Sequence, residues 1–141
     1  MTDTDKPDAY AVEVPAPTSL ELSGQAAPDL IPAFRHRTAD FAAANGATPK
    51  AVEAIALAVS EAVTNVVKHA YEPGKTNRGI WLTGSVTDAL LEITVSDRGC
   101  GFRESSSPGL GVGLSIIADM SAELDIDQGP KGTELRMRFP L

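Results

Sequence analysis

The sequence predicts one α+β domain, a two-layer α/β sandwich with helices on one face of a mixed, mostly antiparallel sheet. Alternating polar and apolar residues, which are typical of half-buried strands, occur near residue 20 and again in two later pairs of runs. Apolar residues at helical spacing fill the region between the first run and those pairs. Strands that pair as hairpins, with the helices grouped together, favour this class over a doubly wound parallel sheet.

Size and charge limit the classes of function. The chain has 141 residues, enough for one domain, and 12 Lys and Arg against 19 Asp and Glu give a net charge of −7. This excess of acid argues against a direct nucleic-acid partner, whose phosphates attract basic surfaces. The chain has one Cys, no basic-then-apolar leader and no apolar run of about 18 residues. We therefore expect a cytoplasmic protein without membrane segments.

The first residues differ in composition from the rest. Residues 1–17 carry several Asp and Pro residues and predict a disordered acidic N-terminal tail, with a partner-binding arm as the less favoured alternative. The folded domain is expected to span residues 18–141. Its first element is a short strand at Ser19–Ser23, where polar and apolar residues alternate.

Two helices are predicted next. The first spans Asp29–Asn45 and stops at Gly46, because glycine readily ends a helix. Thr48 then offers an N-cap hydroxyl, and Pro49 suits the first helical position. The second helix is expected to run to His69 or Ala70.

The second half predicts two hairpins around a glycine-rich segment. Apolar and β-branched residues indicate the strands, and clusters of Gly, Pro and Asp indicate the turns. The predicted elements are strands at 79–86 and 90–96, a glycine-rich segment at 97–113, a short helix at 114–120, and strands at 123–127 and 133–139.

The second helix carries a polar stripe. Glu61, Asn65 and His69 are four residues apart and are expected to stack on one helix face. Taken alone, such a stripe is most often the solvated side of an amphipathic helix. Asn is a poor interior helix former, however, so its position one turn after Glu61 favours ligand binding.

Two glycine motifs follow the first hairpin. Asp97 ends a strand and is followed by Gly99 and Gly101, a pattern that suits close approach of a flat ligand but also fits a plain tight turn. Gly109, Gly111 and Gly113 precede the short helix, where backbone N–H groups and the helix dipole favour an anion. The spacing matches neither the Walker A motif nor the Rossmann fingerprint.

Together these motifs resemble those of the GHKL ATP-binding family, and most of all those of the small bacterial anti-sigma factor serine-protein kinases. Residues 61–70 resemble the family's N box, residues 97–102 its G1 box and residues 109–114 its G2 box. Gly132-Thr133 matches a Gly-Thr pair on one of the last strands. The boxes occur in the family's order, and the similarity spans residues 18–141.

The resemblance implies a role for each motif in binding ATP and Mg²⁺. Asn65 would be the metal ligand, Asp97 would bind the adenine amine with help from Thr133, and Glu61 would be the catalytic base. Glycines of both loops complete the implied site: Gly99 and Gly101 would leave room for adenine, and the amides around Gly109, Gly111 and Gly113 would hold the phosphates.

The implied activity is an anti-sigma factor that is also an ATP-dependent serine/threonine kinase. Its protein substrate would be a STAS-type anti-sigma-factor antagonist, and the chain would sequester a sigma factor in a partner switch. The resemblance also implies a homodimer formed through the first strand and helix. The alternatives are a nucleotide-binding partner-switch module without kinase activity and, less favoured, an ATPase piece of a larger machine.

Overall fold

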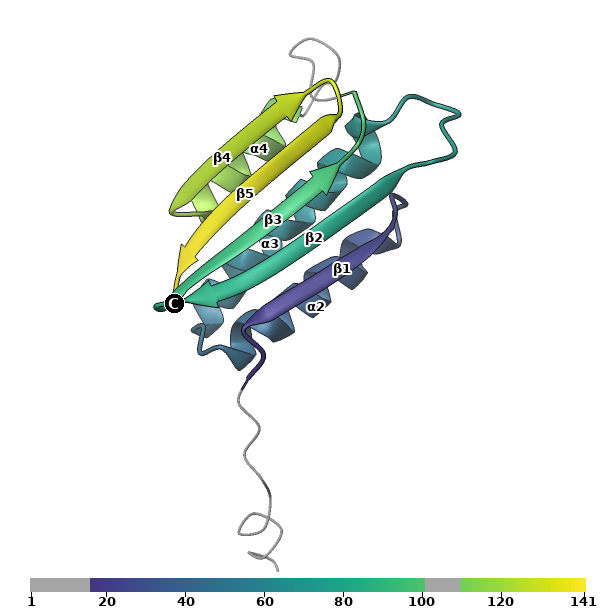
Figure 1. Cartoon of the computed structure of the whole chain (residues 1–141). Coiled ribbons are helices and arrows are strands. Elements are labelled where there is room, and N and C mark those ends of the chain that lie inside the picture. Colours follow the sequence, from purple (N-terminus) through teal and green to yellow (C-terminus); the bar gives the residue numbers. More distant parts are fainter. Residues whose placement is uncertain (1–15, 101–109) are drawn as a thin grey trace, which may run out of the picture.

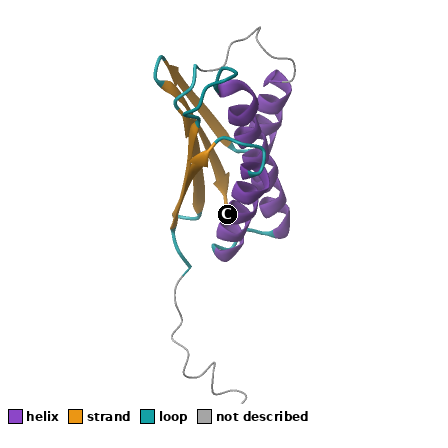
Figure 2. Cartoon of the chain, turned by 90° about the vertical axis from the view of Figure 1, so that its right-hand side faces the viewer, coloured by secondary structure: helices purple, strands orange, loops and turns teal. Residues whose placement is uncertain are grey.

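The computed structural model describes residues 16–100 and 110–141 of the chain. A five-stranded sheet forms one layer, and the helices form a second layer on one of its faces (Figures 1 and 2). The elements in chain order are β1 Ser19–Gln25, α2 Leu30–Ala44, α3 Pro49–Asn65, a π-helical turn Val66–Ala70, β2 Gly79–Thr87, β3 Leu90–Asp97, α4 Leu110–Met120, β4 Glu123–Gly129 and β5 Gly132–Pro140. The predicted α+β sandwich is confirmed.

The strands lie in the order β1-β2-β3-β5-β4, and each of the four pairings is antiparallel. Both predicted hairpins are present. The prediction of a mixed sheet allowed for parallel pairing, but none occurs among these five strands. The β3–β5 pairing brings together segments far apart in the sequence, and it places Asp97 opposite Thr133.

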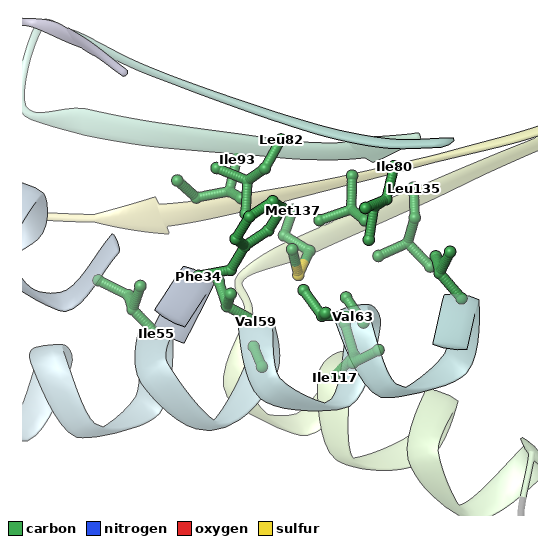
Figure 3. Packing of buried hydrophobic residues seen from close by; sticks show 14 of the residues in the cluster. Phe34, Ile55, Val59, Val63, Ile80, Leu82, Ile93, Ile117, Leu135 and Met137 are labelled. Atoms are coloured by element: carbon green, nitrogen blue, oxygen red, sulfur yellow. The ribbon is translucent and has the colours of Figure 1, made fainter. Parts of the chain in front are cut away.

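The core lies between the sheet and the helices (Figure 3). One face of α3 supplies Ile55, Val59 and Val63, as its apolar spacing predicts, and all three are fully buried. Alternate residues of the central strands meet this face from the sheet; Ile93 and Met137 are among them. The helix therefore has a fixed rotation about its axis, which decides where its polar residues point.

Local signals explain the start of α3. Thr48 has an extended backbone, and its Oγ1 accepts a hydrogen bond from the N–H of Ala51 at 3.1 Å. Pro49 occupies the first helical position, where no intrahelical donor is needed. The predicted cap is confirmed.

Two helix boundaries differ from the prediction. Helix α3 ends as regular α-helix at Asn65, and the last turn before Tyr71 is π-helical. Helix α4 begins at Leu110 instead of residue 114, so Gly111 and Gly113 belong to the helix and not to a loop before it. Both differences fall at the candidate site.

Two further observations concern the chain ends and membranes. Pro17 is tied to the domain, because its carbonyl accepts a hydrogen bond from Asn45 Nδ2 at 2.8 Å. The predicted tail lies almost entirely outside the described residues. Among the described residues, no helix is both long and apolar enough to cross a membrane.

Candidate functional site

The predicted site residues come from four elements that meet at one end of the sandwich. The end of α3 and its π-helical turn lie in the helix layer with the start of α4. The end of β3 and the start of β5 lie beside each other in the sheet. Figure 1 shows that these termini share the same end of the molecule.

Asp97 is a buried carboxylate at the end of β3, with 5% of its surface exposed. Its Oδ1 accepts a hydrogen bond from the N–H of Gly99 at 2.8 Å. Burial raises the pKa of the Asp97 carboxyl, while hydrogen bonds from the backbone N–H groups of Gly99 and Thr133 partly oppose this shift. A buried acceptor of this kind suits an N–H donor of a ligand.

Thr133 lies opposite Asp97 in the sheet and is 4% exposed. Its Oγ1 is buried and has no hydrogen-bond partner within the described part of the chain. A buried hydroxyl without a partner is costly, so such a group needs an explanation. Asp97 and Thr133 thus present an acceptor and a free hydroxyl side by side.

Asn65 is also buried, at 4% exposed, although it lies on the helix face where a solvated stripe was the alternative. That alternative is wrong for Asn65. Its Nδ2 makes no hydrogen bond to any described residue. Glu61, one turn earlier on α3, is half-buried. The two side chains keep the predicted i, i+4 relation because α3 is regular up to Asn65.

The start of α4 lies against Asn65. A Cβ atom added to Gly113 would be 3.1 Å from Asn65 Oδ1, which is tighter than an ordinary contact. Glycine therefore allows the first turn of α4 to approach the Asn65 amide. The N-terminal turn of a helix carries free N–H groups and a partial positive charge, so an anion near Asn65 would be stabilised.

Gly99 has a different contact from the one the sequence suggested. A Cβ atom there would be 2.0 Å from the Ala70 carbonyl oxygen, far inside van der Waals contact. The same oxygen accepts a hydrogen bond from the N–H of Cys100 at 2.9 Å. Gly99 thus lets the turn after β3 pack directly on the end of the π-helical turn. Gly101 and Gly109 lie outside the described residues.

The π-helical turn displaces His69 from the predicted stripe. A π turn has i→i+5 hydrogen bonds, so residues after Asn65 no longer stack at a spacing of four. His69 Nδ1 is buried without a partner among the described residues. Burial lowers the pKa of His69, and Lys68 lowers it further. The imidazole is therefore favoured in its neutral form.

Sequence reasoning missed two residues that brace this end of the sheet. The Tyr71 hydroxyl accepts a hydrogen bond from the N–H of Arg98 at 3.0 Å and donates one to the Gly79 carbonyl. Arg78 donates to the Val67 carbonyl at 3.0 Å, within the π-helical turn. Because these partners are distant in sequence, no local pattern could have indicated them.

A pH experiment tests the burial of Asp97. The pKa of Asp97 in the folded state is raised above the ordinary value of 3.8. Between pH 3.8 and this raised pKa, the folded chain therefore keeps a proton that the unfolded chain has lost. The free energy of unfolding that depends on this group is therefore greatest below pH 3.8 and falls as pH rises through the folded-state pKa. Chemical denaturation of the wild type and Asp97→Asn across the acid range should show this decline for the wild type relative to the variant. Parallel pH profiles would contradict it.

Comparison with known proteins gives the chain its family. The family model described as "Histidine kinase-like ATPase domain" matches residues 24–139, which include each described site residue. Serine-protein kinase RsbW of Halalkalibacterium halodurans is 33% identical over 102 residues, covering 69% of this chain and 61% of that protein. RsbW of Bacillus licheniformis is 34% identical over 83 residues, covering 59% and 51%. The chain thus spans half to three-fifths of these relatives' length.

Solved structures share the fold. One contains the RsbU and RsbW domains of Rv1364c from Mycobacterium tuberculosis, with a TM-score of 0.71, 23% identity and coverage of 87% of this chain and 32% of that one. Another is the SiaB-SiaC complex from Pseudomonas aeruginosa, with a TM-score of 0.66, 15% identity and coverage of 85% and 88%. Because the family model matches residues 24–139, most of the chain, the chain belongs to the histidine kinase-like ATPase domain family.

Proposed function

We propose that this chain is an ATP-dependent serine/threonine kinase that phosphorylates a STAS-type antagonist and sequesters a sigma factor in a partner switch. One observation carries the proposal: the buried Asn65 side chain has an amide Nδ2 without a hydrogen-bond partner among the described residues, and it lies one helical turn after Glu61 and against the start of α4. This arrangement suits a metal–phosphate group. Two relatives named serine-protein kinase RsbW support the reaction class.

The described residues fit a purine nucleotide. Asp97 would accept a hydrogen bond from the adenine amine, and the Thr133 hydroxyl would complete the recognition of the base. Both side chains are buried, and Thr133 Oγ1 lacks a partner in the described part of the chain. A base without an amine at this position would leave the buried Asp97 carboxylate unpaired, so we expect the pair to favour adenine over such bases.

The phosphate end would lie at Asn65 and the start of α4. Asn65 Oδ1 would be the protein ligand of Mg²⁺, and N–H groups near Gly111 and Gly113 would bind phosphate oxygens. Gly109 would contribute in the same way. A chain of net charge −7 can hold a polyanion by these means, without a basic surface.

Glu61 would accept the proton of the attacking serine or threonine hydroxyl. Bound Mg-ATP supplies the phosphoryl group and its metal. The chain's own residues orient the reactants, and most of the rate enhancement would come from that positioning and from charge neutralisation. Glu61 lies on the same helix as Asn65 and is only half-buried, which suits contact with a protein substrate.

The partners and the assembly are further parts of the proposal. The relatives are named serine-protein kinases, which supports a protein substrate, and we propose that this substrate is of the STAS-type antagonist class. We also propose a cytoplasmic homodimer. Strand β1 is an edge of the sheet, with α2 beside it in the helix layer, and an edge strand has unpaired backbone groups that a second copy can use.

Nucleotide binding can be tested by thermal unfolding. Saturating Mg-ATP at about 100 times its Kd should stabilise the folded chain by about 2.7 kcal/mol. Asp97→Asn should remove this stabilisation, because the amide presents a donor where the adenine amine needs an acceptor. Asp88→Asn is the matched control, since Asp88 lies in the exposed β2–β3 turn, and it should keep the full shift. A wild type that does not respond to ATP or ADP would rule out the proposal.

Phosphoryl transfer requires a separate test. The purified chain, Mg-ATP and a STAS-type protein that co-purifies with it should yield phosphoserine or phosphothreonine on that protein, detected by mass spectrometry. ATP-dependent complex formation without a phosphorylated residue would instead identify a nucleotide-binding switch module that is not a kinase. If no STAS-type protein co-purifies with the chain and none is phosphorylated by it, both readings are contradicted.

A further inference from the structure

A pocket lies on the open face of the sheet, outside the proposed nucleotide site. It has a volume of about 400 Å³ and lies where β1 ends and β2 begins. The residues that line it include Trp81, Arg98, Tyr71, Lys75 and Gln25. We call it the Trp81 pocket.

The Trp81 pocket is cationic in a chain that is acidic overall. Lys75 and Arg98 both line it, and none of the described lining residues is Asp or Glu. Neither cation forms an ion pair with a carboxylate of the described residues. Two cations without partners beside polar groups favour an anionic ligand.

Neighbouring groups hold the Trp81 and Arg98 side chains of the pocket in place. The Arg98 guanidinium lies over the Trp81 ring at 4.6 Å from its centroid, and the ring also lies close to Gly79, where an added Cβ atom would be 2.5 Å from it. The Tyr71 hydroxyl joins the backbone of Arg98 to that of Gly79. A cation stacked on an aromatic ring in a braced frame suits recognition of a carboxylate.

We propose that the acidic segment of residues 1–15 of this chain binds in the Trp81 pocket. This segment carries Asp3, Asp5, Asp8 and Glu13 against Lys6 alone, so its charge is opposite to that of the pocket. It leads directly into β1, the strand that forms one wall. The occupant is therefore an acidic peptide already joined to the domain.

The segment is long enough to reach the pocket. Strand β1 has 7 residues, so the return path along it is about 24 Å at 3.4 Å per residue. Fifteen extended residues span about 50 Å. Because the segment is tethered, its effective concentration at the pocket is in the millimolar range, and weak ionic contacts suffice.

Trp81 is the only tryptophan of the chain, so its indole N–H gives a single NMR signal that reports on the pocket. In the full chain, replacing Asp3, Asp5 and Asp8 with Asn and Glu13 with Gln should shift this signal. Raising the salt from 50 to 500 mM should shift the wild-type signal in the same direction, because salt screens the contact. Arg98→Ala should remove the response to the four replacements. Arg35→Ala, which removes an exposed arginine on α2, should keep it.

Coincident Trp81 signals in the wild type and the four-residue variant would overturn the proposal. If a synthetic peptide of residues 1–15 nevertheless shifted the signal of that variant, the pocket would bind acidic segments of other chains, and the assignment to the chain's own segment would be wrong. An unchanged response in Arg98→Ala would also overturn it. Backbone signals elsewhere in the same spectra show that each variant is folded.

Discussion

Replacing Glu61 with glutamine is expected to slow phosphoryl transfer by about 10²- to 10⁴-fold, the usual contribution of a positioned general base. Glutamine keeps the size and polarity of the side chain but cannot accept the hydroxyl proton. Glu61 is half-buried and does not contribute to the apolar core, so the fold should be retained. Single-turnover measurements with saturating Mg-ATP would isolate the transfer step.

The control for this variant is Glu53→Gln. Glu53 is exposed on α3, two turns before Glu61, so both substitutions remove one carboxylate from the same helix. The control should transfer phosphate at the wild-type rate, and both variants should keep the ATP-dependent rise in Tm. If Glu61→Gln transfers phosphate as fast as the wild type, Glu61 is not the base.

Gly99→Ala is expected to reduce the free energy of unfolding by about 3 kcal/mol or more, at the upper end of the range for overpacked sites. The added methyl group would be 2.0 Å from the Ala70 carbonyl oxygen, a backbone atom that cannot rotate away. Relief requires the turn after β3 to move off the π-helical turn. That movement would break the hydrogen bond from Cys100 N–H to Ala70. Urea denaturation of the apo chain would measure the loss.

Gly129→Ala is the matched control, because nothing lies within 4 Å of a Cβ atom at Gly129 and its φ is not positive. Its free energy of unfolding should stay within about 0.5 kcal/mol of the wild type, as for most surface substitutions. A Gly99→Ala variant as stable as this control would show that the close approach to Ala70 does not constrain the fold. Any ATP affinity lost by Gly99→Ala would then need another cause.

Periodicity predicted the layers, the hairpins and the buried face of α3, because burial alone decides those patterns. Ile55, Val59 and Val63 recur on one side of a regular helix and are buried there. The same reasoning failed after Asn65. A change from i→i+4 to i→i+5 hydrogen bonding adds no signature in residue type. The helical segment does end at Ala70, within the predicted range, but its π-helical last turn was not foreseen.

Glycine composition misled the prediction of the start of α4. Gly111 and Gly113 are poor helix formers, which favoured a loop up to residue 113. In the folded chain Gly113 lies against Asn65, where a larger residue would be crowded, and the helix forms in spite of its low propensity. Only the tertiary contact explains the choice of residue.

The candidate site was predictable as a set of motifs but not as a set of contacts. Asp97 was identified from its place at the end of a predicted strand, and Thr133 from the resemblance to the family's Gly-Thr pair, yet their adjacency depends on the β3–β5 register. The contacts of Gly99 with Ala70 and of Tyr71 with Arg98 join residues that are about 30 apart, beyond the reach of any local pattern. The roles of the site residues stay predictions until the variants are measured.

The order of the strands has a consequence for the folding pathway. The β2–β3 and β4–β5 hairpins close short loops, whereas the β3–β5 pairing of Asp97 with Thr133 encloses residues 98–132 and is therefore expected to form later. We therefore expect the nucleotide site to form after the main folding barrier. Mg-ATP should then leave the refolding rate nearly unchanged and lower the unfolding rate, so that the bound nucleotide keeps the β3–β5 pairing from opening.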